Sequence, residues 1–243
     1  MKLLLAAATC TILTIIAGSV LILPLFQRSP QSTSVKRVML SFSILEIGNV
    51  SEYCSNLSSI LTLHNVKATV FFVGRGAEQN PEAVSCLSNA CDIGSQTYSY
   101  VDLTSIPDYT VQLDEVERGK QAVDSAGDLC SKLFKAPYGS TDENIYSLLG
   151  RSEIIADFSY EDHYNIYENG HFVRFEAAVY EGSNHTADFF LTLPETDRPL
   201  IIDFDNTYST SNIDFFLSRL KTGKIEFVTA SEVAGTPLTI RGG

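Results

Sequence analysis

The chain has 243 residues, of which 44% are hydrophobic and 19% are charged, and this length and balance predict a globular protein of one or two domains. The composition excludes disordered, collagen-like and coiled-coil proteins. Seventeen Lys and Arg against 29 Asp and Glu give a net charge of −12, and both nucleic acid and anionic lipid repel so acidic a chain. We therefore expect no nucleic-acid partner.

An apolar segment opens the chain. Residues 3–26 contain no charged side chain, and a helix of this length, rising about 1.5 Å per residue, would cross a hydrocarbon core of about 30 Å. The alternative is a cleaved signal peptide, whose apolar part is about 7–15 residues long. Because the run continues past Ala17, Gly18 and Ser19, the pattern favours an uncleaved membrane anchor at residues 1–26, followed by a polar linker at residues 27–35.

Two kinds of signal disagree about the side of the membrane on which the domain lies. Lys2 precedes the apolar run and Arg28, Lys36 and Arg37 follow it, so a positive-inside count favours a cytoplasmic domain. Three Asn-x-Ser/Thr sequons and an even number of cysteines after Cys10 point outward, because an even number fits two disulfides. We expect a membrane-anchored, extracytoplasmic domain. The four cysteines are Cys54, Cys86, Cys91 and Cys130.

Beyond the linker, apolar strands alternate with helical patterns. Strands are predicted at residues 38–42, 67–73, 92–94, 133–136, 153–158, 172–175, 199–204 and 225–228. Helices are predicted at residues 51–63, from residue 80 onward, and at 107–125, 142–149 and 211–220. This alternation indicates an α/β fold with a parallel sheet or barrel wrapped by helices, and in such folds reactive groups lie at the carboxyl ends of the strands.

Four segments carry a more specific signal. They are residues 65–74 (NVKATVFFVG), 92–104 (DIGSQTYSYVDLT), 134–139 (FKAPYG) and 217–233. In this order they resemble segments of the polysaccharide deacetylase family, also called the NodB homology domain or carbohydrate esterase family 4. The resemblance covers residues 36–235 and implies a deformed (β/α) barrel, which leaves residues 236–243 as a C-terminal tail.

The resemblance also implies a chemistry, the removal of acetyl groups from N-acetylated sugars. Family members hold a divalent metal, usually zinc, with one Asp and two His. A second Asp serves as general base and a late His as general acid. The metal lowers the pKa of its bound water from about 15.7 to about 7 and polarises the amide carbonyl.

Other residues occupy the metal-binding positions in this chain. Ser43 stands at the position of the base, and Ile44, which has no lone pair to offer, stands at that of the metal-binding Asp. Gln96 and Tyr100 take the places of the two His. Gln96 could bind a hard cation weakly through its carbonyl, whereas Tyr100 would have to ionise from a pKa near 10.

The remaining catalytic positions are substituted too. Lys135 replaces the Arg of the third motif, which keeps the charge but loses the bidentate fork. Asp205 takes the place of the late His, with Asp203 as the alternative. Without the metal, about 9 pK units of water activation are lost, on the order of 12 kcal/mol. We therefore predict a degenerate family member with no metal, no cofactor and no catalytic residue that can be named.

Tyr98, Pro137, Tyr138 and Asp203 are the candidate substrate-binding residues. Aromatic faces and hydroxyls suit sugars, although ordinary packing is the alternative for each tyrosine outside the Pro137-Tyr138-Gly139 turn. Asp203 and Asp205 alternate on one strand and should face the same side, either as a carboxylate pair or as strand-end turn residues.

The histidines offer no paired metal-binding motif. Asp162 and His163 fall in a polar, Tyr-rich stretch at residues 159–171, which we interpret as a solvated loop. His64 is expected at the end of the barrel opposite the site, and His185, inside a sequon, is expected at the surface.

For the cysteines, three pairings are open. In the fold that the resemblance implies, Cys91 and Cys130 each precede one of two adjacent strands. This favours a Cys91–Cys130 disulfide, with Cys54–Cys86 linking the first two helices.

The functional hypothesis is a membrane-anchored, deacetylase-like protein that binds a glycan or cell-envelope polysaccharide without catalysis. The alternative is an active hydrolase of the carbon–nitrogen bonds of N-acetylated sugars, with a rearranged site built from Asp203, Asp205, Gln96 or nearby groups. A third hypothesis is a partner protein of an active paralogue.

Overall fold

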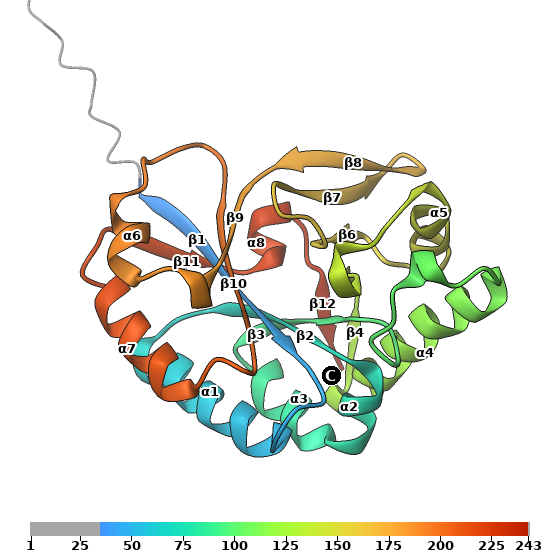
Figure 1. Ribbon diagram of the computed structural model, residues 1–243, viewed down its shortest axis with the longest axis horizontal. Coiled ribbons are helices and arrows are strands. Elements are labelled where there is room, and N and C mark those ends of the chain that lie inside the picture. Colours follow the sequence, from blue (N-terminus) through green and yellow to red (C-terminus); the bar gives the residue numbers. More distant parts are fainter. Residues whose placement is uncertain (1–34, 243) are drawn as a thin grey trace, which may run out of the picture. The chain divides into compact units, whose positions relative to one another are not determined.

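The computed structural model describes residues 35–242, which Figure 1 shows as a curved sheet backed by helices. Within these residues no helix is long and apolar enough to cross a membrane. The predicted transmembrane anchor at residues 1–26 and nearly all of the predicted linker lie outside the described residues.

A sheet of ten strands, curved into a nearly closed barrel, forms the centre of the domain. Its order is β8-β7-β6-β5-β3-β2-β1-β10-β9, and β11 pairs with the first half of β1. All pairings are parallel except those of β7 with β6 and β8. This confirms the predicted α/β fold of barrel type. The strands are β1 (Lys36–Ile44), β2 (Ala68–Phe72), β3 (Cys91–Ser95), β5 (Leu133–Phe134), β6 (Ala156–Asp157), β7 (His163–Glu168), β8 (His171–Glu176), β9 (Ala178–Glu181), β10 (Leu200–Asp205) and β11 (Ile225–Val228).

Helices cover the outside of the sheet, and α7, α1, α3 and α4 follow one another along it in Figure 1. The sequence defines their ends locally. The Asn49 side chain accepts the backbone N–H of Glu52 at the start of α1, and Asn65 ends α1 in the left-handed conformation. The helices are α1 (Val50–His64), α2 (Gly74–Gln79), α3 (Pro81–Ser88), α4 (Tyr109–Gly127), α5 (Glu143–Arg151), α6 (Ala187–Thr192), α7 (Thr210–Leu220) and α8 (Ala230–Ala234).

Alternate residues of β1 face two different environments, as the two-residue period of a strand requires. Val38, Leu40 and Phe42 are buried against the helices in an outer core. Met39 joins a second core inside the barrel. Ser41, one step further along the same face, is no longer in that core and lines an open cleft.

Strand β10 follows the same rule beside β1, with Ser41 opposite Asp203 and Ser43 opposite Asp205 in the parallel register. Ile202 packs in the outer core. Asp203 and Asp205 both line the cleft, which confirms that they face the same side.

A hairpin that the sequence analysis missed forms one wall of the barrel. Strands β7 and β8 are antiparallel and joined by a two-residue turn at Asn169 and Gly170, both with positive φ. The prediction of a solvated loop at residues 159–171 is therefore wrong for most of that stretch. Asn-Gly between two alternating segments is a strong hairpin signal, because both positions of the favoured turn need positive φ.

The predicted disulfides are not formed, and all four cysteines of the described residues are free. Cys54 and Cys91 lie in the outer core, where burial raises the pKa of both thiols. Cys130 lies on β4 (Leu129–Ser131), with its Sγ 4.0 Å from Lys120 Nζ. The predicted Cys91–Cys130 and Cys54–Cys86 disulfides are therefore wrong here. The two strands expected to be adjacent, β3 and β5, do pair, but Cys130 lies on β4, which pairs with β12.

The last residues of the chain pack onto the domain. The segment assigned to a C-terminal tail contains β12 (Thr239–Arg241), which is antiparallel to β4. Just before it, Leu238 is fully buried in the core inside the barrel.

Candidate functional site

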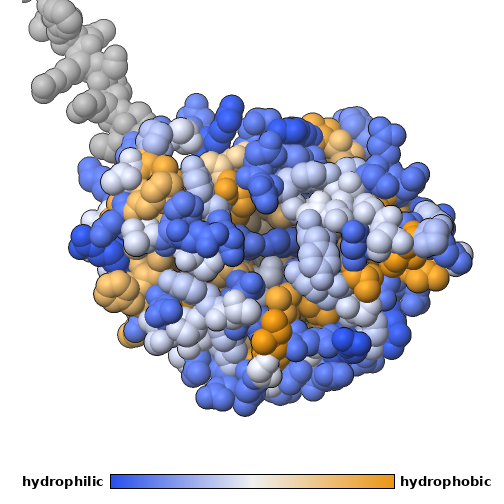
Figure 2. Space-filling view, in the orientation of Figure 1, coloured by the Kyte–Doolittle hydropathy of each residue, from blue (hydrophilic) through white to orange (hydrophobic). Residues whose placement is uncertain are grey.

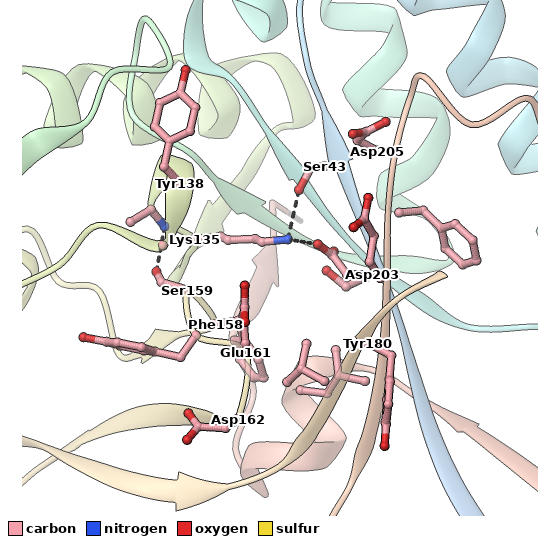
Figure 3. Close-up of a pocket in the computed structure, with 18 of the residues that line it drawn as sticks. Ser43, Lys135, Tyr138, Phe158, Ser159, Glu161, Asp162, Tyr180, Asp203 and Asp205 are labelled. Carbon is pink, nitrogen blue, oxygen red and sulfur yellow. Dashed lines mark hydrogen bonds and ion pairs between the residues drawn. The ribbon is translucent and has the colours of Figure 1, made fainter. Parts of the chain in front are cut away.

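A cleft of about 980 Å³ opens at the carboxyl ends of the parallel strands, where the sequence analysis places the site. Its floor comes from β1, β10 and the residues that follow β3 and β5, and its wall from the segments after β6 and β9 (Figure 3). Figure 2 shows mainly hydrophilic side chains on this side of the molecule, with apolar residues in small separate patches.

A lysine occupies the centre of the cleft. Figure 3 shows the Lys135 side chain crossing it toward β1 and β10. Its Nζ donates to Asp203 Oδ2 at 2.5 Å and to Ser43 Oγ at 3.1 Å. The side chains of Lys135 and Asp203 are only 15% and 28% exposed. The ammonium therefore makes a partly desolvated, hydrogen-bonded ion pair at the level of Ser43, the position that the family gives to its base.

The two positions that replace the histidines do not supply metal ligands. Gln96 is 1% exposed, and its Nε2 donates to the backbone carbonyl of Phe71 at 3.0 Å. Burial raises the pKa of the Tyr100 phenol, and the nearby Tyr138, Asp205 and Asp203 raise it further. Tyr100 is thereby held as the neutral phenol, which is a poor ligand for a divalent cation.

The metal-binding Asp position is turned away from the cleft. Ile44 is buried in the outer core between the sheet and the helices and does not line the cleft. Residues 35–242 contain no group of three or more His, Cys, Asp or Glu side chains that could hold a metal ion. The residues present do not fit the divalent metal that the family resemblance implies.

An exposed tyrosine stands at the mouth of the cleft. Tyr138 lies in the turn after β5 with φ of 60° and ψ of 12°, and it is 72% exposed. Its ring centroid lies 5.3 Å from that of Tyr100. A large aromatic side chain kept exposed in a left-handed conformation suggests a binding role, because both features cost stability.

A buried carboxyl group holds this turn in place. Asp157, at the end of β6, accepts a hydrogen bond from Ser159 Oγ, which accepts the backbone N–H of Ala136 at 2.7 Å. Burial is the largest influence on Asp157 and raises its pKa to about 6. The sequence analysis predicted a strand at residues 153–158 but did not single out Asp157, because no local pattern marks its carboxyl group as buried.

Two of the candidate binding residues lie outside the cleft lining. Tyr98 points to the surface between α2 and α4, where its hydroxyl donates to Glu78 at 2.6 Å and Arg118 lies over its ring at 3.6 Å. Pro137 is buried in the turn, and its neighbours Ala136 and Tyr138 line the cleft instead.

The wall opposite the floor consists of residues that the sequence analysis did not assign to a site. His163 is buried at the start of β7, with its ring 4.0 Å from the ring of Tyr160. His185 is half-buried at the surface of the cleft and stacks on Phe189 at 4.2 Å. Glu161, Asp162, Tyr180 and Glu181 complete this wall.

Comparisons with known proteins agree with this architecture. A family model described as polysaccharide deacetylase matches residues 31–154, just over half of the chain. The peptidoglycan-N-acetylglucosamine deacetylase PgdA of Listeria monocytogenes is 27% identical over 213 residues, which cover 87% of this chain and 41% of that protein. A peptidoglycan-N-acetylglucosamine deacetylase of Bacillus cereus is 29% identical over 94 residues, covering 38% of this chain and 34% of that protein. The chain thus spans about two fifths of the length of the Listeria relative.

Solved structures share the fold. The Bacillus anthracis protein BA3943, described as a CE4 family pseudoenzyme, superposes with a TM-score of 0.61 at 17% identity, covering 82% of this chain and 65% of that one. The Bc1960 peptidoglycan N-acetylglucosamine deacetylase superposes with a TM-score of 0.62 at 21% identity, covering 83% and 89%. At these identities the likeness establishes the barrel fold alone.

Proposed function

Because this chain belongs to the polysaccharide deacetylase family, we propose that it is a non-catalytic member that binds a cell-envelope glycan. One observation carries the proposal. The Lys135 ammonium, paired with Asp203, is hydrogen-bonded to Ser43, the residue at the position of the family's base.

Hydrolysis of an amide needs a nucleophile and a group that stabilises the developing oxyanion. Gln96 is tied to a backbone carbonyl and Tyr100 stays protonated, so neither activates water as a bound metal would. The loss amounts to about 9 pK units of water acidity, on the order of 12 kcal/mol, and a single hydrogen bond contributes about 1 kcal/mol. The arrangement favours binding over turnover.

The cleft retains what glycan binding requires. Its volume of about 980 Å³ lies at the upper end of the range for ligand pockets, roughly 300–1,000 Å³. Tyr100 and Tyr138 offer aromatic faces at the mouth, and hydroxyl and carboxylate groups line the floor. Sugars combine apolar ring faces with hydroxyls that need polar partners, and this lining supplies both kinds of contact.

The names of the relatives suggest the polymer, since both curated proteins are peptidoglycan-N-acetylglucosamine deacetylases. We propose peptidoglycan, or another envelope glycan with amino sugars, as the ligand. The apolar run at residues 3–26 supports membrane anchoring, and the three sequons support an extracytoplasmic domain, where such a polymer would be reached.

Acetate release and glycan binding, measured on the same preparation, test the proposal. The full chain, purified with detergent and supplied with zinc, is incubated with an N-acetylated chito-oligosaccharide. We expect no acetate above the level of a heat-denatured control, together with saturable binding of an amino-sugar oligosaccharide in calorimetry.

The alternative of an active, rearranged hydrolase makes the opposite prediction. Acetate release that is lost in Asp205→Ala and kept in the matched surface variant Asp188→Ala would favour it. Absence of binding to every envelope oligosaccharide tested would refute the glycan-binding function itself.

A further inference from the structure

We propose that the cleft selects glycans whose amino groups are free and protonated over glycans whose amino groups are acetylated. This inference rests on the proposed glycan-binding function and specifies its ligand. The main observation behind it is a set of carboxylates on the cleft lining that have no cationic partner.

Three carboxylates of the lining have no cationic partner within the described residues. Glu161 makes no polar contact within the described residues. Asp205 accepts hydrogen bonds from the backbone N–H and the hydroxyl of Thr207. Glu181 accepts from Ser183 Oγ at 3.0 Å and Asn184 Nδ2 at 2.6 Å. These donors are neutral, so they orient the carboxylates without cancelling their charge.

The Lys and Arg side chains near the cleft are already paired. Lys135 is the only Lys or Arg on the lining within residues 35–242, and its ammonium lies on Asp203. Asp162 is paired with Arg174 at 3.0 Å. Figure 3 shows Glu161 and Asp205 on different sides of the Lys135 ammonium, so a ligand in the cleft meets a carboxylate on either side of this pair.

Two side chains of the cleft floor carry an acceptor atom that has no donor within residues 35–242. Gln96 is 1% exposed and lines the cleft, and its Oε1 accepts no hydrogen bond within residues 35–242, since its one side-chain bond uses Nε2. Asp203 Oδ1 is buried and has no partner there either. An acceptor without a donor favours a ligand rich in donors, and an alkylammonium group brings three donors and no acceptor.

An acetamido group fits this floor less well. It replaces the ammonium by one N–H donor, a carbonyl acceptor and a methyl group. Its carbonyl would meet a lining on which Glu161, Glu181 and Asp205 are acceptors themselves. The aromatic pair Tyr100 and Tyr138 adds to the selectivity, because a ring face attracts a cation within about 6 Å.

The charge of the whole domain acts in the same direction. All 29 Asp and Glu lie after residue 34, against 15 Lys and Arg. A polymer with many ammonium groups is therefore attracted from a distance, and the attraction weakens with salt. The long-range field does not by itself distinguish a sugar from any other polycation, which is why the test includes both.

Calorimetry with three tetrasaccharides of one backbone tests the inference. The full chain, purified with detergent, is titrated at mildly acidic pH with the β-1,4-linked glucosamine tetramer, its fully N-acetylated form and cellotetraose. We expect the glucosamine tetramer to bind at least about tenfold more tightly than the other two, a difference that corresponds to about 1.4 kcal/mol.

Single substitutions test which carboxylates produce the selectivity. Glu161→Gln and Asp205→Asn should each lower the affinity for the glucosamine tetramer about fivefold, the upper range for an exposed ion pair. The matched control Glu117→Gln removes the same charge from the exposed side of α4 and should leave the affinity unchanged. An equal loss in the Glu117→Gln control would overturn the inference, because the attraction would then be general.

The remaining outcomes are separable. Equal or tighter binding of the N-acetylated tetramer overturns this inference but leaves the glycan-binding function standing. Binding of tetralysine as tight as that of the glucosamine tetramer overturns the selection of a sugar. Failure of all three tetrasaccharides to bind refutes the proposed function together with this inference.

Discussion

The two faces of β1 have different roles in the molecule. On the outer face Val38, Leu40 and Phe42 are completely buried against the helices. On the inner face, one residue out of step, Ser41 and Ser43 line a cleft whose centre is an ion pair rather than a set of metal ligands. Alternate residues of one strand thus belong either to the core or to the cleft, so cleft residues can be substituted while the barrel remains.

The largest expected effect is on the outer face. Phe42→Ala should lower the free energy of unfolding by about 3–5 kcal/mol, because it removes a fully buried ring stacked on Phe204 and leaves a cavity. The neighbouring Ser43→Ala, which loses one hydrogen bond to Lys135, should cost about 1 kcal/mol. Urea denaturation measures both, and equal costs would contradict the division between the two faces.

A pH effect from Asp157 comes next. Burial raises its pKa to about 6, above the unfolded value of about 3.9, so the folded state holds a proton that the unfolded state releases between these pH values. Wild-type stability should therefore fall relative to Asp157→Asn as pH rises from about 4 to 6, by about 3 kcal/mol, and stay level above that range. Denaturation curves at a series of pH values measure the difference, and a constant difference would contradict this account.

The central ion pair should show coupling. Lys135→Met leaves the Asp203 carboxylate half-buried without a cation and should cost about 1–3 kcal/mol. Lys135→Met combined with Asp203→Leu should recover part of this loss, because no charge is then left unpaired. A double-mutant cycle of unfolding free energies gives the coupling, and strictly additive costs would show that the pair does not act as a unit.

The smallest expected effect on stability is at Tyr138, where function and stability should move in opposite directions. Tyr138→Gly should raise stability by about 0.5–1 kcal/mol, since glycine adopts positive φ without strain, while glycan affinity falls. Asn65→Gly relieves the strain of the same left-handed conformation at the end of α1 and should leave glycan affinity unchanged. Calorimetry on both variants would contradict a binding role if Tyr138→Gly bound as tightly as the wild type.

The sequence predicts the core strands better than it predicts the cleft. Continuous apolar runs such as residues 67–73 gave a strand, and short motifs such as Pro137-Tyr138-Gly139 placed the cleft at the correct end of the barrel. The wall carrying Glu161 and His163 was missed, because β7 is polar on its exposed positions and its Asn-Gly turn was not recognised as a hairpin.

Other features depend on tertiary contacts that no local pattern records. The thiols of Cys54 and Cys91 are predicted from their number to form disulfides, but their environment is the apolar core between sheet and helices. The orientation of Ile44 away from the cleft follows from the strand register, and the Lys135–Asp203 pair joins residues 68 positions apart. Residue types at motif positions therefore predict which site positions are substituted, whereas only the structure shows the Lys135–Asp203 pair that lies among them.

Zinc titration of the full chain, followed by calorimetry and by metal content after gel filtration, tests the central claim most directly. The predicted result is no saturable heat and less than one tenth of a zinc ion per chain, because Gln96, Tyr100 and Ile44 offer no ligand set and Lys135 places a positive charge beside the site. One zinc ion per chain, lost in Asp205→Asn and accompanied by acetate release from an N-acetylated oligosaccharide, would contradict it.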